Sequence, residues 1–344
     1  MRLVVISDLH FKLGTWSPFI KEYEGIYYPK INLQHCCEIA KKYNCDAILV
    51  LGDVFDRKIN PHSIIDIVCQ TFEEVSVEKP VYCLIGNHDY LSLPVEDKDF
   101  FTSLSAIKSE SVHIIDTYEE DIFGPETVAV SFPSRKFILE KAEEWIGKTL
   151  FTHIGITGFQ IHKDMTIPDE FTTEQLSLYK RVITGHYHIP QEKDNIVFVG
   201  SPWPLKKDEY DDEKRILVVD TLTDEITSIP SIFTKVREIS VKNVKEFERL
   251  FEKISSDLKE DFHQKFKIKI SSKSIPRSLL VKLQDTFGYH VYVERQDQSE
   301  KPVLEISSDE TLTKLSLEKI LEGYLTEEEV SLLSRERLWS QIFQ

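Results

Sequence analysis

The sequence is poor in cysteine and has no pattern of paired cysteines. Its five cysteines, among 344 residues, are odd in number and never form a CxxC pair, which argues against a disulfide framework or a zinc ribbon. Cys69 and Cys83 lie in apolar stretches, where we expect buried thiols in a reducing compartment. The full set is Cys36, Cys37, Cys45, Cys69 and Cys83.

Long hydrophobic runs are missing as well. No apolar segment approaches the roughly 18–20 residues that span a bilayer. The first predicted strand begins at Arg2, which leaves no room for a signal peptide. We therefore expect a cytoplasmic protein without a membrane segment.

Positive charge is in deficit, because 42 Lys and Arg face 58 Asp and Glu and give a formal net charge of −16. This balance argues against broad, nonspecific coating of nucleic acid, which depends on neutralising phosphates. It does not exclude a nuclease, since bound metals neutralise carboxylates and a local basic track can bind a DNA backbone.

Short β-branched runs alternate with helical or turn-rich segments up to about residue 230. The first three runs are almost entirely apolar, as expected for strands covered on both faces, and helical spacing at Leu33–Tyr43 and Ser63–Glu74 connects them. Later runs lack long helices between them, which indicates a second, more antiparallel sheet packed on the first. The predicted strands are Leu3–Ser7, Ala47–Leu51, Val81–Ile85, Thr127–Phe132, Thr149–His153, Arg181–Thr184, Ile196–Gly200 and Arg215–Asp220.

The character of the sequence changes near residue 230. Domain 1–230 is followed by a small α+β unit, 235–300, in which strand, helix, strand, helix and strand alternate. A charged loop, Ser299–Pro302, precedes a helical segment, 308–344, where Thr326 and Glu329 form a capping box. The predicted elements of the small unit are Val236–Val241, Val244–Ser255, Phe266–Ile270, Pro276–Thr286 and His290–Glu294.

Residues of metal-ligand type recur in order, each at or just after the end of a predicted strand. In open α/β sheets the carboxyl ends of strands face one crevice, so we expect these residues to converge. Carboxylates with imidazoles suit Mn, Fe, Zn or Co better than Mg, and two metals about 3.5–4 Å apart can share a hydroxide for in-line attack on a phosphoester. The motifs are Asp8-Leu9-His10, Gly52-Asp53, Gly86-Asn87-His88-Asp89, His153 and Gly185-His186-Tyr187-His188.

Individual residues of the set suggest different roles. Asp53 can bridge two cations through its two oxygens, while Asn87 adds a neutral oxygen ligand. His88 is expected to face the substrate, because its neighbour Asn87 points toward the metals, and to stabilise the transition state or protonate the leaving alkoxide. Asp56 is placed to orient that imidazole. A lone histidine in an apolar strand, such as His153, is usually a core residue, and only the surrounding set indicates a ligand.

These residues, as an ordered set over roughly residues 1–220, resemble the calcineurin-like metallophosphoesterase superfamily. Three details resemble the SbcD-type nucleases of double-strand-break repair and recombination complexes, which include compact phage recombination endonucleases. These details are Gly52-Asp53-Val54-Phe55-Asp56 before Asn60-Pro61, the form GNHD, and Gly185-His186-Tyr187-His188-Ile189-Pro190-Gln191 leading to Val199-Gly200-Ser201-Pro202.

The resemblance implies a layered α/β/β/α sandwich with a capping domain at 235–300 and C-terminal helices that dock on an SbcC-type coiled-coil ATPase. It also implies 3′-to-5′ exonuclease activity on duplex ends, endonuclease activity on single strands and hairpins, and a homodimer. Mn is the favoured ion, with Mg possible, and His88 is the catalytic histidine. The implied ligands are Asp8, His10, Asp53 and His188 for one metal, and Asp53, Asn87, His153 and His186 for the other.

The metal site by itself leaves other functions open. A small-molecule phosphodiesterase or a phosphoprotein phosphatase would use the same chemistry, although phosphatases typically carry GDxVDRG and GNHE, which this chain lacks. A non-catalytic scaffold that binds DNA ends is a third alternative. The C-terminal helix can pack on its own domain instead of a partner. The candidate phosphate contacts are Arg57, Lys58, Arg135, Lys136, Lys206 and Lys207.

Overall fold

The computed structural model describes residues 1–14, 16–17, 21–95, 98–162, 165–206, 209, 212–233, 236–260, 265–270, 276–287 and 291–295. The predicted loop Ser299–Pro302 and the predicted C-terminal segment 308–344, including Thr326 and Glu329, lie outside these ranges. Within them, no helix combines the length and the apolar character that crossing a membrane requires.

The first sheet has six strands in the order β18-β17-β1-β4-β5-β8. Strands β1, β4, β5 and β8 are parallel, whereas β17 and β18 continue the sheet in antiparallel pairing. The strands at both edges, β8 and β18, were not predicted; β18 has only exposed and half-buried side chains and lacks the apolar run that marks the central strands. The bounds are β1 Arg2–Ile6, β4 Ala47–Val50, β5 Val81–Leu84, β8 Val112–Ile115, β17 Arg215–Asp220 and β18 Glu225–Pro230.

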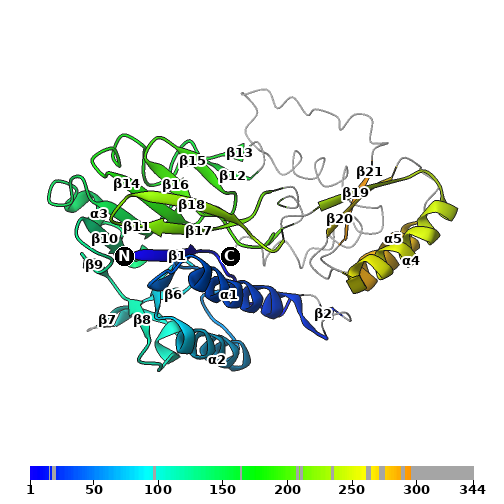
Figure 1. Cartoon of the computed structure of the whole chain (residues 1–344), viewed down its shortest axis with the longest axis horizontal. Helices are drawn as coiled ribbons and strands as arrows, with labels where there is room; N and C mark the ends of the chain where they lie inside the picture. Colours follow the sequence, from blue (N-terminus) through cyan, green and yellow to red (C-terminus); the bar gives the residue numbers. More distant parts are fainter. Residues whose placement is uncertain are drawn as a thin grey trace, which may run out of the picture. The chain divides into compact units, whose positions relative to one another are not determined.

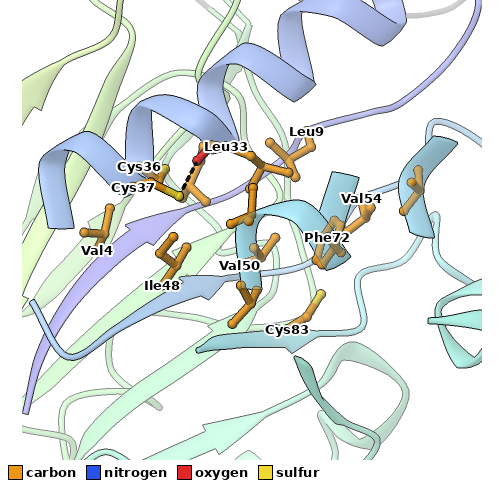
Figure 2. Packing of buried hydrophobic residues seen from close by; sticks show 14 of the residues in the cluster. Val4, Leu9, Leu33, Cys36, Cys37, Ile48, Val50, Val54, Phe72 and Cys83 are labelled. Atoms are coloured by element: carbon orange, nitrogen blue, oxygen red, sulfur yellow. Dashed lines mark hydrogen bonds between the residues drawn. The ribbon is translucent and has the colours of Figure 1, made fainter. Parts of the chain in front are cut away.

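Two long helices, α1 (Glu24–Lys42) and α2 (His62–Glu78), lie together against one face of this sheet (Figure 1). Both were predicted, but α1 begins well before Leu33 because its early turns, which contain Pro29, bury side chains in the core. Figure 2 shows the thiols of this layer inside the apolar packing, with the Cys37 thiol donating to the Leu33 carbonyl at 3.7 Å. The cysteines here are therefore core residues, as expected.

The second sheet has the order β15-β16-β14-β11-β10-β9. The prediction of a more antiparallel sheet is wrong, because β10, β11, β14 and β16 are mutually parallel and only the edge strands β9 and β15 are antiparallel. Turns and short helices make the crossovers here, so the lack of long helices did not imply hairpins. The bounds are β9 Tyr118–Glu120, β10 Thr127–Val130, β11 Thr149–His153, β14 Arg181–Gly185, β15 Gln191–Lys193 and β16 Ile196–Phe198.

The two sheets pack face to face and form a layered α/β sandwich. Leu49 and Leu51 of the first sheet share one buried cluster with Phe151 and Ile183 of the second. The outer face of the second sheet is covered by α3 (Phe137–Glu140) and by turns that bury residues such as Trp145. Such packing removes apolar surface from water, which is the main source of stability for a core of this kind. The sandwich fixes the strand ends that carry the ligand motifs.

The described elements between residues 236 and 295 form a small unit with a hydrophobic cluster of its own. Its three strands are parallel in the order β19-β20-β21, and the predicted alternation of strands and helices is confirmed. Its identification as a capping domain stays a prediction. The bounds are β19 Val236–Val241, α4 Val244–Glu260, β20 Lys265–Ile270, α5 Arg277–Phe287 and β21 Val291–Arg295.

Short elements complete the described chain. Three two-stranded pairs join β2 with β3, β6 with β7, and β12 with β13. Their bounds are β2 Trp16–Ser17, β3 Glu22–Tyr23, β6 Tyr90–Val95, β7 Lys98–Thr102, β12 Gln160–His162 and β13 Met165–Thr166, and the 3-10 turns are η1 Ser103–Ala106 and η2 Phe132–Ser134.

Candidate metal centre

The predicted ligands come from the ends of strands in both sheets. Asp8 and His10 follow β1, Asp53 follows β4, Asn87 follows β5, His153 ends β11, and His186 and His188 follow β14. Asp8, His10, Asp53 and His186 all have positive φ angles, of 55°, 50°, 50° and 90°. Non-glycine residues rarely adopt this conformation, and such strain concentrates at functional sites, where surrounding contacts hold it in place.

Two glycines allow the loops after β4 and β5 to touch. Gly52 has a φ of +89°, and a Cβ there would lie 2.7 Å from the Gly86 amide nitrogen. A Cβ on Gly86 would lie 2.2 Å from Oδ1 of Asp53. Neither position can therefore carry a side chain without moving a ligand loop.

The side chains form two clusters that are suited to hold metal ions. Asp8, His10 and His188 make one group, and Asp53, His153 and His186 make the other; within each group one ligand atom per residue lies within 4.8 Å of the others. Their carboxylate and imidazole atoms fit divalent transition metals. Both ring nitrogens of His10 are buried and have no hydrogen-bond partner among the described residues, as expected for a ring aimed at an ion.

Asp53 lies between the two groups. Its Oδ2 is 3.7 Å from Nε2 of His10 in the first group and 3.3 Å from Nε2 of His153 in the second. Its Oδ1 accepts a hydrogen bond of 2.8 Å from the His88 main-chain nitrogen, which fixes the carboxylate plane. One oxygen of Asp53 thus faces ligands of both groups, as the predicted bridging role requires.

Asn87 belongs with the second group. Its Oδ1 lies 3.0 Å from Nε2 of His153 and 2.8 Å from Nδ1 of His186. The amide oxygen therefore points to the same place as the two imidazoles, where the resemblance expected it.

The charges of the cluster act on one another strongly. Burial alone would raise the pKa of Asp53, but the charge of His153 and its hydrogen bond outweigh burial and hold that pKa well below its usual range. Burial likewise opposes protonation of His153, yet Asp53 raises the His153 pKa to about 9. A metal and a proton compete for this imidazole, so metal binding weakens as the pH falls.

His88 stands at the open side of the cluster. Its side chain is 42% exposed, its Nε2 lies 4.0 Å from Oδ2 of Asp53, and its ring is 5.2 Å from that of His10. Burial lowers its pKa, and a hydrogen bond to the Asp56 main chain opposes this. The Asp56 carboxylate instead accepts a hydrogen bond of 2.7 Å from Lys12. The main chain of Asp56 is thus the part that bonds to His88, while its carboxylate pairs with Lys12.

Asp89 holds the loops of the site together. Its Oδ1 accepts from the Phe55 amide at 2.8 Å, and its Oδ2 accepts from the amides of Gly86 at 2.9 Å and Val54 at 3.2 Å. Burial, with the nearby charge of Asp53, raises the Asp89 pKa to about 6. The sequence placed Asp89 in the GNHD motif but gave no indication of this role.

Sequence reasoning also missed two residues beside His188. Nδ1 of His188 lies 2.9 Å from Oε1 of Glu209, and Nζ of the fully buried Lys214 lies 2.9 Å from Oε2 of the same carboxylate. Burial would raise the pKa of Glu209, but His188 and Lys214 outweigh it and lower that pKa far below its usual value. Glu209 lies in an acidic stretch that reads as surface, so no signal distinguished it.

The predicted phosphate contacts differ in availability. Arg57 has an 83% exposed side chain directly after Asp56. Lys58 lies over the Tyr90 ring, and Arg135 lies over the Phe132 ring and pairs with Glu170. Lys136 lies 5.2 Å from the centroid of the Phe137 ring; Lys207 is outside the described residues. Lys206 is exposed as well, and Arg57 directly follows Asp56, whose carboxylate lies 4.0 Å from its Nε.

The sequence is similar to those of known proteins. The family model described as calcineurin-like phosphoesterase matches residues 1–222. Exonuclease subunit 1 of Enterobacteria phage T4 is 26% identical over 254 residues, which cover 70% of each chain.

Two solved structures are also similar. An archaeal phosphodiesterase has 17% identity and a TM-score of 0.34, covering 67% of this chain and 99% of its own. A dimetal phosphatase from Danio rerio has 12% identity and a TM-score of 0.38, with the same coverage of 67% and 99%.

Proposed function

Because the chain belongs to the calcineurin-like phosphoesterase family, we propose that it is a metal-dependent DNA nuclease, with 3′-to-5′ exonuclease activity on duplex ends and endonuclease activity on single strands and hairpins. Its work would lie in double-strand-break repair or recombination, in the cytoplasm. The observation that carries the chemistry is the position of Asp53, whose Oδ2 faces ligands of both metal groups.

Two divalent ions, with Mn favoured, would be held by seven side chains of the chain. When bound, such a pair lowers the pKa of the attacking water and neutralises charge on the phosphodiester. Asp53 serves both ions. The ligands are Asp8, His10, Asp53 and His188 on one side and Asp53, Asn87, His153 and His186 on the other.

His88 is the catalytic histidine in this proposal. Its half-exposed ring stands beside Asp53 without belonging to either metal group, so it can reach a substrate phosphate. A ring nitrogen that carries a proton can donate it to the leaving oxygen, a contribution of about 10²–10⁴-fold in rate. Asp56 orients this ring through its main chain.

DNA as the substrate is supported by the relative named exonuclease subunit 1, since that match covers 70% of both chains. Recognition would be of the DNA backbone and of its ends, with Arg57 as the first phosphate contact. If the DNA assay fails, the favoured alternative function is a small-molecule phosphodiesterase.

The relative is named as a subunit, which supports a partner for this chain. We assign this partner as a coiled-coil ATPase of the SbcC type, docked on the segment 308–344, and we expect a homodimer of the nuclease. Deleting Thr326–Gln344 should abolish association with the ATPase and leave the melting temperature unchanged. A large loss of stability would instead show that the segment belongs to the protein's own core.

The assay of the nuclease uses linear duplex DNA with a labelled end, incubated with the purified chain in Mn or Mg. We expect shortening from the 3′ ends, lost in His88→Asn. His113→Asn is the matched control, because that exposed imidazole pairs with Glu119 outside the metal groups.

Two results would contradict the proposal. Turnover of a generic phosphodiester without cleavage of DNA, even after the ATPase is added, would exclude DNA as the substrate. Full DNA cleavage by His88→Asn would exclude the catalytic role of His88.

A further inference from the structure

A buried ion pair stands directly behind one metal ligand. Lys214 has no solvent exposure, and its Nζ donates to the His188 carbonyl oxygen at 2.9 Å, to Ser201 Oγ at 3.0 Å and to Glu209 Oε2 at 2.9 Å. Asp212 is a further partner at 3.3 Å. Lys214 therefore uses its whole donor capacity on groups that surround His188.

Glu209 contacts the side chain of the ligand His188. Its Oε1 lies 2.9 Å from Nδ1 of His188, and its Oε2 also accepts from the Leu205 amide at 3.0 Å. A carboxylate beside Nδ1 keeps the proton on that nitrogen and leaves Nε2 as the ligand atom. The pair thus fixes both the main chain and the tautomer of His188.

Lys214 also joins the two sheets at this point. It immediately precedes β17 of the first sheet, whereas His188 follows β14 of the second. A main-chain hydrogen bond of 3.1 Å from Ser201 to the His188 carbonyl holds the same loop. The position of His188 relative to Asp8, which follows β1 beside β17, therefore depends on this bridge.

The other metal group is supported differently. Nδ1 of His153 lies 2.7 Å from the main-chain carbonyl of Leu51, a neutral acceptor that belongs to the loop of Asp53. The 2.8 Å approach of Asn87 Oδ1 to Nδ1 of His186 joins two candidate ligands of the same group and adds no charged support. Among the described ligand imidazoles, His188 is therefore the one that has, within hydrogen-bond distance, a carboxylate that is not itself a candidate ligand.

We propose that Glu209 and Lys214 are positioning residues that set the metal affinity of the group Asp8, His10 and His188, while the group around His153 binds its ion without them. The inference rests on the proposed two-metal centre. Partners of this kind typically change metal affinity by about 10- to 100-fold. Removing the pair should therefore lower the metal affinity of the group with His188 by this factor and leave the affinity of the other group unchanged.

The test measures bound metal and not activity. Full-length wild type, Glu209→Gln and the double variant Glu209→Gln/Lys214→Met are stripped with a chelator and dialysed against increasing Mn²⁺. Wild type should bind two ions per chain, whereas in both variants one ion should need about 10- to 100-fold more Mn²⁺. At intermediate concentrations the variants should show the electron paramagnetic resonance signal of isolated Mn²⁺.

The double variant keeps the test valid if the single variant does not fold. Replacing both members of the ion pair removes the two buried charges together, although Asp212 also loses its contact with Lys214, and circular dichroism should show a native fold. Tyr187→Phe is the matched control in the same loop: its hydroxyl bonds to Asp169 and to no ligand atom, so its titration should match wild type.

The outcomes are distinct. Wild-type titration in both variants, loss of both ions together, or an equal loss in Tyr187→Phe would overturn the inference. A wild-type chain that binds fewer than two ions would instead refute the two-metal centre on which the inference depends.

Discussion

Oδ2 of Asp53 lies 3.3 Å from Nε2 of His153, with both side chains buried at the junction of the two sheets. The same oxygen faces His10 of the other metal group. Asp53→Asn removes the shared anionic oxygen but retains an Oδ1 that can accept from the His88 amide. We expect bound Mn²⁺ to fall from two ions to fewer than one per chain, as measured by equilibrium dialysis.

The control for Asp53→Asn is Asp66→Asn, which changes an exposed carboxylate on α2. It should bind metal like wild type. Retention of two tightly bound ions by Asp53→Asn would show that this carboxylate does not bridge the groups.

Asp89→Asn should destabilise the fold of the ligand loops. Asp89 accepts hydrogen bonds from three amides through two oxygens, and asparagine offers a single acceptor oxygen. Each buried donor left without a partner lowers the free energy of unfolding by about 1–3 kcal/mol. The midpoint of urea unfolding, measured with a chelator present to remove metal, should therefore fall clearly. Asp116→Asn, on an exposed side chain, should leave the midpoint unchanged. An unchanged midpoint in Asp89→Asn would show that these three hydrogen bonds do not stabilise the ligand loops.

The convergence of the candidate ligands was predictable because their chemistry and their position carry independent signals. Asp8, Asp53 and His153 each sit where an apolar run ends, and the ends of parallel strands converge in any sheet of this type. The residue types alone then indicate a metal. Pairing within the second sheet was not predictable in the same way, because its crossovers are turns without a periodic pattern.

The residues that contact the ligands from behind were not indicated by any pattern in the sequence. Lys214 and Glu209 meet His188 only because β17 and β14 belong to two sheets that pack on each other. No spacing rule relates such positions, and Glu209 lies among acidic residues typical of a surface.

Asp56→Ala should leave most of the turnover intact. The main chain of Asp56, which bonds to His88, survives this substitution, and the lost ion pair with Lys12 is partly exposed. An ion pair of this kind contributes little, so we expect kcat to fall by less than about tenfold. His88→Asn, assayed in parallel, should lose about 10²–10⁴-fold. Equal losses in the two variants would assign the catalytic role to the Asp56 carboxylate as well.

Arg57→Ala should weaken DNA binding without changing kcat. The side chain is 83% exposed directly after Asp56, and in the proposed function its removal would delete one phosphate contact. The slope of log affinity against log salt should therefore drop by about 0.7–0.9, as measured by fluorescence anisotropy with a labelled DNA end. Lys180→Ala is the control, because this exposed residue precedes β14 at the opposite end of the strand from His186. A slope unchanged in Arg57→Ala would remove Arg57 from the DNA path.

The cysteines of the folded protein should resist alkylation and disulfide exchange at neutral pH. Burial raises the pKa of Cys37 and of Cys45 to about 11, and it raises the pKa values of Cys36 and Cys83 as well. Because the thiolate is the reactive form, about one part in a thousand of a thiol with this pKa is ionised at pH 8, and this fraction rises about tenfold per pH unit up to the pKa. Cys69 is the least buried of the set and should react first with Ellman's reagent.

Unfolding in urea should release all five thiols to rapid reaction at pH 8, with a common pKa near that of free cysteine, about 8.5. Rapid reaction of more than one thiol in the folded chain would contradict the packing of α1 and β5 described above. The buried thiols lie between the first sheet and its helices, so their reaction rate also reports local opening of this layer. If metal binding leaves the stability of this layer unchanged, the reaction rate should stay constant when Mn²⁺ is added.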